Sequence, residues 1–365
     1  MSLATTELRR KPGRFAVATI VLTFLSLLLL LLGGLLDGLF LGSTGAIRAQ
    51  DADAIVYSDS ARDSFLRSRI TADVRAQVEA VAGVAEVGGL GFTLLGAQVP
   101  GERDLADVAV AGYEIPPSGV PEVPPAGHAW ADERLQDAGV SIGDTLLVGP
   151  AATPIVVDGW VQDTNYLLQG GLWTTLDTWR TVQNANRPDA FVADGVVQVL
   201  VVRGDGTASD LPAAIDAATG TTASLTVDEA VNALPGVKEQ KSTFNAIIYS
   251  TLAVVLAVVG LFFSLLTLER TGLYGVLKAI GASTRRLFAG VVVQAVIVAL
   301  VAFVASGVLA VAAEAALPGS IPLQLTTGRY VFTFVALIVA AVLGSAISLR
   351  RVTRIDPASA IGSAA

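Results

Sequence analysis

Few side chains of this 365-residue chain are suited to catalysis or to metal binding. Cysteine is absent, and there is a single histidine, His128, and a single methionine. The chain therefore lacks thiolate nucleophiles, disulfides and clusters of soft metal ligands, and one histidine supports no hydrolytic triad. The sequence predicts no catalytic residue, no metal site and no cofactor held by this chain itself.

Two carboxylates are notable because they lie at the ends of strongly apolar segments. Asp37 follows the pair Gly33-Gly34, and Glu314 lies within the run VLAVAAEAALPG. An ionisable group in an apolar helix is costly, and it often serves a function. Each acid is either a helix-end charge that faces water or a polar handle for an amphiphilic molecule that enters sideways from a membrane.

The segment TLERTGLYGVLKAIGASTRRLF, residues 267–288, is the most informative in the chain. The spacing of its apolar residues predicts an amphipathic helix at a membrane surface, with one lysine on the other face. The apolar residues are Leu273, Val276, Leu277 and Ile280, and the lysine is Lys278. Gly281 and Ala282 are expected to end this helix, and Ser283 is expected to cap the next. The helix either only anchors the loop or docks in a groove of a partner protein.

These residues are positioned by four apolar segments, each long enough to cross a membrane. Hydrophobic residues make up 53% of the chain and charged residues only 15%. We predict transmembrane helices at residues 15–43, 243–268, 287–314 and 330–349, with connecting loops at 269–286 and 315–329. The apolar core of the first helix is too long for a cleaved signal peptide, so we expect it to remain as an anchor.

The distribution of charge predicts the orientation, because short loops rich in Lys and Arg stay in the cytoplasm. Residues 1–14, 269–286 and 350–365 are predominantly basic, so we place both termini and this loop on the cytoplasmic side of a plasma or inner membrane. Residues 44–242 then lie outside, and they carry a net charge of −15 within a total of −8. This acidity either keeps the domain soluble or attracts cations, and it argues against a nucleic-acid partner.

The segment from residue 44 to residue 242 is predicted to be a mixed α+β domain. Strands are expected at 84–97, 155–161 and 196–202, and helices at 68–82 and, capped by Asp210, at 210–218. Five prolines within residues 116–125 indicate an extended loop, and Gly88, Gly89 and Gly91 are typical of a bulge or turn. Residues 228–242 are expected to be helical and to continue unbroken into the second span.

Two stretches resemble FtsX-like, MacB-type ABC transporter permeases. The run LERTGLYGVLKAIGAS, residues 268–283, is similar to the family segment E-R…E-I-G-L-L-R-A-L-G-A-S, although the second acid is missing here. Glu269 and Arg270 match the first pair of that segment, and residues 278–283 match its end. Residues 350–361 (RRVTRIDPASAI) are similar to the family ending R-x-x-x-x-D-P-x-x-x-L.

The resemblance implies four transmembrane α-helices with a large extracytoplasmic α+β domain between the first two. It also implies a homodimer in which each permease contacts a separate ABC ATPase subunit through the 269–286 loop. The coupling residues would be Glu269, Arg270, Leu273, Tyr274, Val276, Leu277, Lys278, Gly281 and Ala282. The chain contains no Gly-Lys dipeptide and hence no Walker A motif, so ATP and Mg²⁺ are expected on the partner subunit.

One branch of that family, the DevC/HrtB-like permeases, is similar in length and in the region that follows the anchor, here residues 51–70. This similarity implies export of haem or of another hydrophobic, lipid-like compound out of a lipid membrane. The FtsX division proteins also resemble the chain, and they imply the alternative of a mechanotransmitting protein that regulates an extracellular partner without transport. A membrane-anchored enzyme is a third hypothesis, for which the sequence offers no catalytic constellation.

Overall fold

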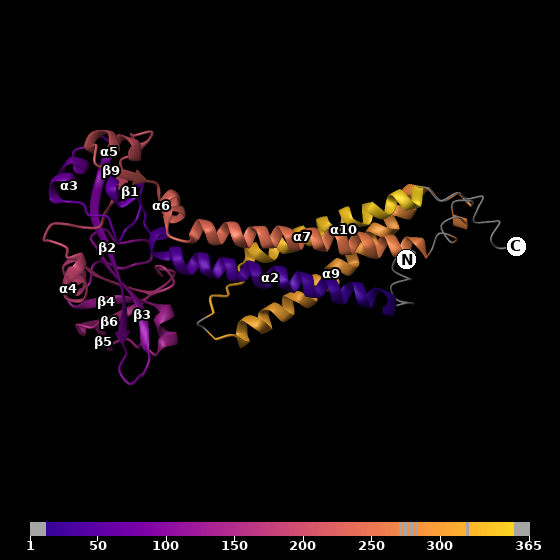
Figure 1. The fold of residues 1–365 in the computed structure, drawn as a ribbon, viewed down its shortest axis with the longest axis horizontal. Coiled ribbons are helices and arrows are strands. Elements are labelled where there is room, and N and C mark those ends of the chain that lie inside the picture. Colours follow the sequence, from indigo (N-terminus) through magenta and orange to yellow (C-terminus); the bar gives the residue numbers. More distant parts are fainter. Residues whose placement is uncertain are drawn as a thin grey trace. The chain divides into compact units, whose positions relative to one another are not determined.

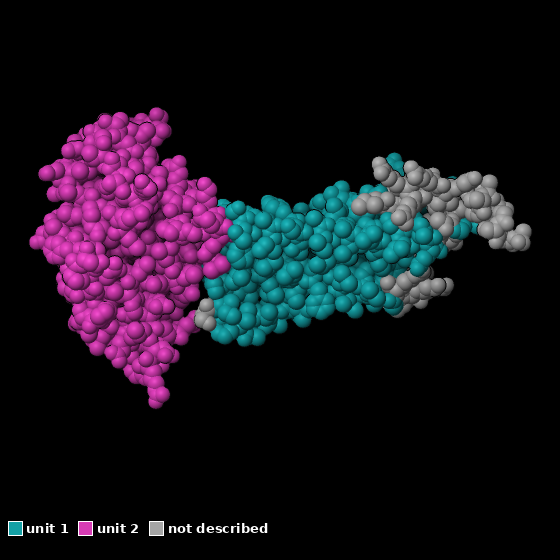
Figure 2. Space-filling model, in the orientation of Figure 1, with its two compact units in different colours: residues 1–38, 241–365 teal, residues 39–240 magenta. Residues whose placement is uncertain are grey.

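The computed structural model of the protein describes residues 12–269, 272, 276–277, 280–281, 283–318 and 321–353. The chain forms two compact units, which Figure 2 colours separately. Residues 1–38 and 241–365 form the first, which we name the helical unit, and residues 39–240 form the second, the sheet unit. Two helices in Figure 1 have residues in both units, namely α2 (Pro12–Arg48) and α7 (Val237–Leu268).

Four helices among the described residues are long and apolar enough to cross a membrane. They are α2, α7, α9 (Thr284–Ala316) and α10 (Thr327–Thr353). The predicted fold class, four transmembrane helices with a mixed α/β domain between the first two, is therefore confirmed. Helix α2 extends beyond residue 43, where the first span was expected to end, because its last turns belong to the sheet unit.

The helical unit has a continuous apolar core with contributions from all four helices, including Leu22, Val255, Ala299 and Leu337. Small residues let the helices approach closely, as membrane helices commonly do. A Cβ at Gly344 in α10 would lie 2.8 Å from Val259 Cγ1 in α7, so only glycine fits there without a shift. Large apolar side chains elsewhere on these helices face outward and are suited to contact with lipid.

The sheet unit contains nine strands, which are joined into one sheet in the order β3-β7-β4-β6-β5-β2-β8-β1-β9. The strands are β1 (Ala54–Ser58), β2 (Val84–Gln98), β3 (Leu105–Tyr113), β4 (His128–Asp132), β5 (Thr145–Val148), β6 (Thr153–Val161), β7 (Gly170–Thr175), β8 (Val199–Gly204) and β9 (Thr222–Leu225). The helices are α3 (Ala72–Glu79), α4 (Leu176–Asn186), α5 (Leu211–Thr219) and α6 (Val227–Ala233), with short 3₁₀ turns η1 (Asp59–Ala61), η2 (Glu133–Ala138) and η3 (Pro188–Ala190).

Strand β2 organises the sheet because its 15 residues pair with three other strands. Residues 84–90 pair with β8, and residues 90–98 pair with β3, both antiparallel. A further pairing of Ala97 and Gln98 with β5 closes β2, β3, β7, β4, β6 and β5 into a ring of six strands. The remaining strands extend from the other half of β2 as an antiparallel sheet ending at β9.

Two apolar cores lie in this unit. One contains Val108, Leu146, Leu172 and Trp179, and α3, α4 and α5 contribute to it. The other contains an aromatic group, the end of α2 and part of α6. Its rings make edge and stacking contacts in the sequence Tyr57, Phe65, Phe92, Trp173 and Tyr113, with Tyr166 stacked on Phe92. Ala46 and Ile47 of α2 are fully buried against this group.

The prediction for the glycines at positions 88, 89 and 91 was wrong. They lie inside β2, and no turn or bulge occurs at them. Their lack of a side chain makes room for neighbours instead: a Cβ at Gly91 would overlap the indole ring of Trp179, and one at Gly88 would lie 2.6 Å from Ile115 Cγ1. Glycine here serves close packing of β2 against α4 and, at Gly88, against Ile115.

Other expected elements differ in extent from those observed. The helix expected at 68–82 is α3, which starts only after Thr71 because Ile70 pairs with Val197 as an isolated bridge. The continuous helix expected over residues 228–242 is broken between α6 and α7, where Pro235-Gly236 follows α6 and Gly236 has a positive φ of 82°. Residues 116–125 contain no helix or strand, as expected, and the Asp210 cap of α5 is confirmed.

Candidate functional site

The loop between α7 and α9 is described only in part. Of its predicted coupling residues, Arg270, Leu273, Tyr274, Lys278 and Ala282 lie outside the described residues. Glu269 directly follows α7, and its N–H donates to Leu265 O at 3.1 Å. Val276 and Leu277 are helical, and Gly281 has a positive φ of 99°.

Two apolar side chains of this loop are exposed one helical turn apart. Val276 is 49% exposed and Ile280 is 76% exposed, and the N–H of Ile280 donates to Val276 O at 3.1 Å. Side chains four residues apart in a helical turn share a face. The observed part of the loop therefore presents apolar groups outward, and the Ser283 side chain caps α9 by accepting from Arg286 N at 3.3 Å.

The two predicted substrate handles lie beside the connection between α9 and α10. Asp37 forms an ion pair with Arg329, whose Nη2 and Nε lie 2.6 and 3.2 Å from its two carboxylate oxygens. Thr326 Oγ1 donates to the same carboxylate at 2.8 Å. Glu314 accepts a hydrogen bond from Leu325 N at 3.1 Å. The structure thus places both acids against residues 325–329.

Sequence reasoning missed Arg329 and Thr326, the residues that hold Asp37. Arg329 was assigned to the 315–329 loop and given no role, although it was a basic residue close to an apolar helix. An unpaired Asp37 in an apolar helix was itself a signal that a basic partner was needed. That partner lies 292 residues along the chain, so spacing alone could not identify it.

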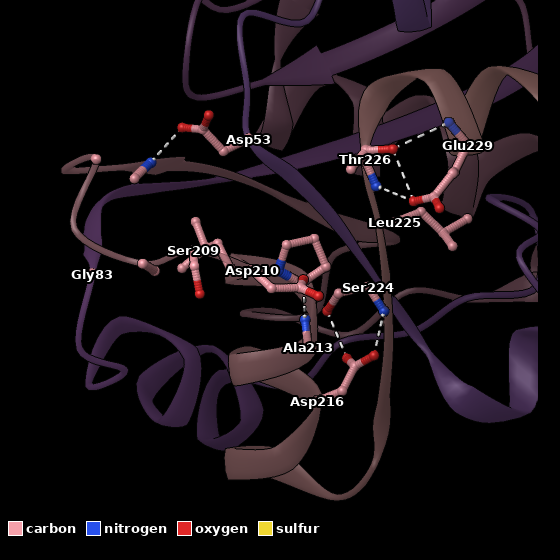
Figure 3. Close-up of a pocket in the computed structure, with 15 residues that line it drawn as sticks. Asp53, Gly83, Ser209, Asp210, Ala213, Asp216, Ser224, Leu225, Thr226 and Glu229 are labelled. Carbon is pink, nitrogen blue, oxygen red and sulfur yellow. Dashed lines mark hydrogen bonds between the residues drawn. The ribbon is translucent and has the colours of Figure 1, made fainter.

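A pocket of about 630 Å³ lies in the sheet unit near the start of α5 (Figure 3). Four carboxylates line it, and each accepts a hydrogen bond from a main-chain N–H of its own chain. The pairs are Asp53 with Gly204, Asp210 with Ala213, Asp216 with Ser224, and Glu229 with Thr226. The pKa of Glu229 is lowered by hydrogen bonds from the Thr226 main chain and hydroxyl. These acids cap main-chain groups, which accounts for their positions without a ligand.

His128, the single histidine of the chain, begins strand β4. Its Nδ1 lies 2.7 Å from Asp158 Oδ1 of the neighbouring strand β6, and its side chain is about one-third exposed. No group of three or more metal-ligating residues occurs among the described residues. This pair is therefore a cross-strand contact of the sheet.

The last turns of α2 are held by a loop of the sheet unit, residues 163–168, which we name the clamp loop. Its main chain donates from Leu168 N to Gly42 O at 2.9 Å and from Leu167 N to Ser43 O at 3.1 Å, and it accepts from Ala46 N at Asn165 O. Arg48 Nη2 donates to both carboxylate oxygens of Asp163, at 2.7 and 2.8 Å.

The clamp loop is held in an unusual conformation. Asp163, Leu167 and Leu168 have φ values of 54°, 50° and 68°, in the left-handed region that disfavours residues with a side chain. Such conformations persist only where the surrounding contacts impose them. The contacts with α2 supply that constraint, so the end of α2 and the clamp loop depend on each other.

Comparison with known proteins gives a family match in the helical part of the chain. Residues 245–357 match the family described as FtsX-like permease C-terminal. A Staphylococcus epidermidis protein named as the permease HrtB of a hemin transport system is 24% identical over 137 residues, 38% of this chain and 39% of that protein. The match thus spans well under half the length of that relative.

Two longer matches come from Mycobacterium tuberculosis, and both are named uncharacterized ABC transporter permeases. One is 29% identical over an alignment of 368 positions, which covers 96% of each chain. The other is 27% identical over an alignment of 382 positions, which covers 98% of each chain. Among solved structures, the extracellular domain of the transporter YknZ from Gram-positive bacteria has a TM-score of 0.33 at 11% identity and covers 48% of this chain and 99% of its own. The periplasmic region of MacB from Actinobacillus actinomycetemcomitans has a TM-score of 0.35 at 13% identity and covers 52% and 96%.

Proposed function

We propose that this chain, whose residues 245–357 are an FtsX-like permease domain, is the membrane subunit of an ABC-type exporter. The exported compound is hydrophobic or amphiphilic, of the haem or lipid-like class. The energy comes from ATP that is hydrolysed on a separate ATPase subunit. The chain is a multi-pass membrane protein, and a homodimer of it carries two coupling loops.

One observation carries the proposal: the FtsX-like match covers α7, α9 and α10 together with the loop that joins α7 to α9. In a permease that lacks its own ATPase, this loop is the part that must receive force from a partner. Exposed Val276 and Ile280 suit such a contact, because apolar side chains that project from a membrane protein at its water-facing end need a partner surface.

The coupling residues have distinct roles in this proposal. Glu269 and Arg270 make charged contacts with the ATPase at the entrance to the loop. The apolar groups fill its groove, Lys278 marks the opposite face, and the turn allows the chain to enter α9. The apolar groups are Leu273, Tyr274, Val276 and Leu277, and the turn is Gly281-Ala282.

The orientation follows from the same proposal, with both termini and residues 269–286 in the cytoplasm and residues 44–242 outside. Because the chain has no cysteine, single cysteines can report it directly. A membrane-impermeant maleimide should label Ser141→Cys in intact cells, and it should label Ser283→Cys only after the cells are opened. Labelling in the reverse pattern would contradict this orientation.

The substrate handles are also part of the proposal. Glu314 offers a carboxylate at the end of α9, where a hydrogen bond from Leu325 N leaves acceptor capacity on its two oxygens. In this structure Asp37 forms an ion pair with Arg329, so its carboxylate becomes available to a substrate only if that ion pair opens. An amphiphile with a hydrogen-bond donor or a cationic group suits both acids.

The first test is purification of the tagged chain in mild detergent from its host, with co-purifying proteins identified by mass. We expect a stoichiometric ATPase of the ABC type, and its reproducible absence would contradict the proposal. Glu269→Lys and Val276→Pro should then abolish transport while the chain stays in the membrane. Val276→Leu, which keeps an apolar helix-forming side chain, is the matched control and should remain active.

A second candidate function, mechanotransmission without transport, is supported by the clamp loop. The clamp loop is hydrogen-bonded to residues 42–46 of α2, and α2 is also one of the membrane-spanning helices. A displacement of these turns of α2 would therefore displace the clamp loop. The two functions differ in what stimulates the ATPase. Stimulation by a hydrophobic compound supports export, whereas stimulation only by an extracellular protein supports mechanotransmission.

A further inference from the structure

The connection between α9 and α10 contains an extended segment, Ile321–Thr326, which we name the strap. The strap belongs to the helical unit and lies against the last third of that unit's α2. Gln324 N donates to Gly34 O at 3.1 Å. The strap has no helix or strand of its own, so α2 provides its support.

Glycines of α2 make the surface on which the strap lies. A Cβ at Gly34 would lie 2.7 Å from Leu325 Cδ2 and 3.0 Å from Leu323 Cδ1. A Cβ at Gly38 would overlap the carbonyl group of Pro322. Gly34 and Gly38 are four residues apart and share one face of the helix, so together they leave a face without side chains that the strap covers, and we name this face the α2 groove.

Charged groups tie both sides of the strap. On the α2 side, the carboxylate of Asp37 accepts hydrogen bonds from Thr326 Oγ1 at 2.8 Å and from Arg329 at 2.6 and 3.2 Å. On the α9 side, Glu314 accepts from Leu325 N at 3.1 Å. Every charged group named here thus acts on the strap or on the first turn of α10 that follows it.

These attachments are of a kind that can open. Asp37 and Arg329 keep 20% and 14% of their side-chain surface exposed, so water can reach the ion pair at its edge. Among the described residues, a single main-chain hydrogen bond joins the strap to α2. Gly33, Gly34 and Gly38 also make this part of α2 easier to deform than a helix of larger residues.

We propose that the strap is a releasable closure of the α2 groove, held in the described state by the Asp37–Arg329 ion pair. This inference rests on the proposed export function. During the transport cycle the ion pair opens, the strap leaves the groove, and Asp37 and the glycine face of α2 become accessible to the apolar compound. The described state is then the closed one.

The test uses the full chain with its ATPase in proteoliposomes, and the absence of native cysteine makes a disulfide specific. The Asp37→Cys/Thr326→Cys pair joins the strap to α2, at two side chains that already lie 2.8 Å apart. Oxidation should lower transport at least about tenfold relative to the reduced form of the same variant, because the open state is no longer populated, and a reductant should return transport to the level of that reduced form, which itself lacks the Asp37 carboxylate. The control pair is Ser26→Cys/Ser306→Cys, at hydroxyls 2.8 Å apart in the core between α2 and α9, and its oxidised form should stay active.

A charge exchange provides a second measurement that needs no disulfide. Arg329→Gln should raise ATPase activity in the absence of transported compound several-fold, because the closed state loses its ion pair. Asp37→Arg/Arg329→Asp should return that activity to the wild-type level. Unchanged activity in Arg329→Gln would overturn the proposal, as would inactivation of both oxidised disulfide pairs or of neither.

Failure of the closure and failure of the proposed function give different results. If the closure is wrong, the reduced and oxidised forms of the Asp37→Cys/Thr326→Cys pair transport equally well. If the export function is wrong, the wild-type chain itself shows no ATP-dependent transport with its purified partner.

Discussion

Replacing Gly45 with alanine should loosen the attachment of the clamp loop to α2. A Cβ at this position would lie 2.5 Å from Asp163 O and 3.0 Å from Asn165 N. These are main-chain atoms, which cannot rotate away as the end of a side chain can. The loop must therefore move, and its left-handed residues lose the contacts that impose their conformation.

The expected loss of stability follows from the contacts at stake. Three main-chain hydrogen bonds join the loop to α2, and each contributes about 1 kcal/mol net. Overpacking adds about 1–3 kcal/mol, and the better helix propensity of alanine returns about 1 kcal/mol. The free energy of unfolding of the sheet unit should fall by about 3–5 kcal/mol.

Tryptophan fluorescence of the full-length protein during urea unfolding measures this change. The chain has four tryptophans, at positions 130, 160, 173 and 179, and all lie in the sheet unit. The denaturant slope of a unit of this size lies near the upper end of the usual range, at about 3 kcal/mol per molar urea, so the midpoint should fall by roughly 1–2 M.

The matched control lies one turn earlier on the same helix. A Cβ at Gly42 would lie 3.0 Å from Arg134 Nη1 and Leu168 Cδ2, which are ends of flexible side chains. Gly42→Ala should therefore change the midpoint little. If Gly45→Ala unfolds at the same urea concentration as Gly42→Ala, the argument that main-chain contact holds the loop is refuted.

Three further predictions concern pH, a sheet edge and the membrane helices. Burial raises the pKa of Tyr57, Tyr113 and Tyr166 above the ordinary value of 10.0. Because the folded-state pKa values are raised, the contribution of these neutral phenols to the free energy of unfolding is complete below pH 10 and is lost as the pH rises above it. The loss is up to about 1.4 kcal/mol per pH unit for each tyrosine. Urea unfolding should show a steep loss of stability only above pH 10, and a flat profile there would contradict the assignment. Asp216→Ala should lower the free energy of unfolding by about 1–3 kcal/mol and promote self-association through edge strand β9, since Asp216 accepts from Ser224 N and Oγ at 3.0 and 2.6 Å. Light scattering of the variant measures the association, and a monodisperse, equally stable variant would contradict the prediction. Ser306→Val should destabilise the helical unit by about 0.6–1.7 kcal/mol, because it removes the buried bond to Ser26; thermal unfolding in detergent tests this, with no change as the contrary result.

The transmembrane part of the fold was predictable because its signal is local. A run of about 20 apolar residues has few alternatives to a membrane helix, whatever the rest of the chain does. Caps were predictable for the same reason: Asp210 and Ser283 each bond to a main-chain N–H three residues away. The sheet order was not predictable, since β2 pairs with β3, β5 and β8, at separations along the chain that the sequence pattern does not encode.

The candidate site shows the same division. Asp37 and Glu314 were selected because a charge in an apolar run is locally anomalous. Their partners Arg329 and Leu325 depend on how α2, α9 and α10 pack, which is a tertiary property. The glycines of β2 were misread because glycine permits both a turn and a close contact, and only the position of Trp179 distinguishes them.

The order of the strands has a consequence for how the protein is made. Among the described residues, strand β1 pairs only with β8 and β9, and β8 begins about 145 residues after β1. At about 5–20 residues per second, β1 waits roughly 7–30 s for its partners during synthesis. Its sequence, AIVYS, is apolar and unpaired for that whole interval. We therefore expect the nascent chain to need a holding chaperone between the completion of α2 and the arrival of α7, and depletion of such chaperones should lower the yield of this protein more than that of a permease whose outer segment is short.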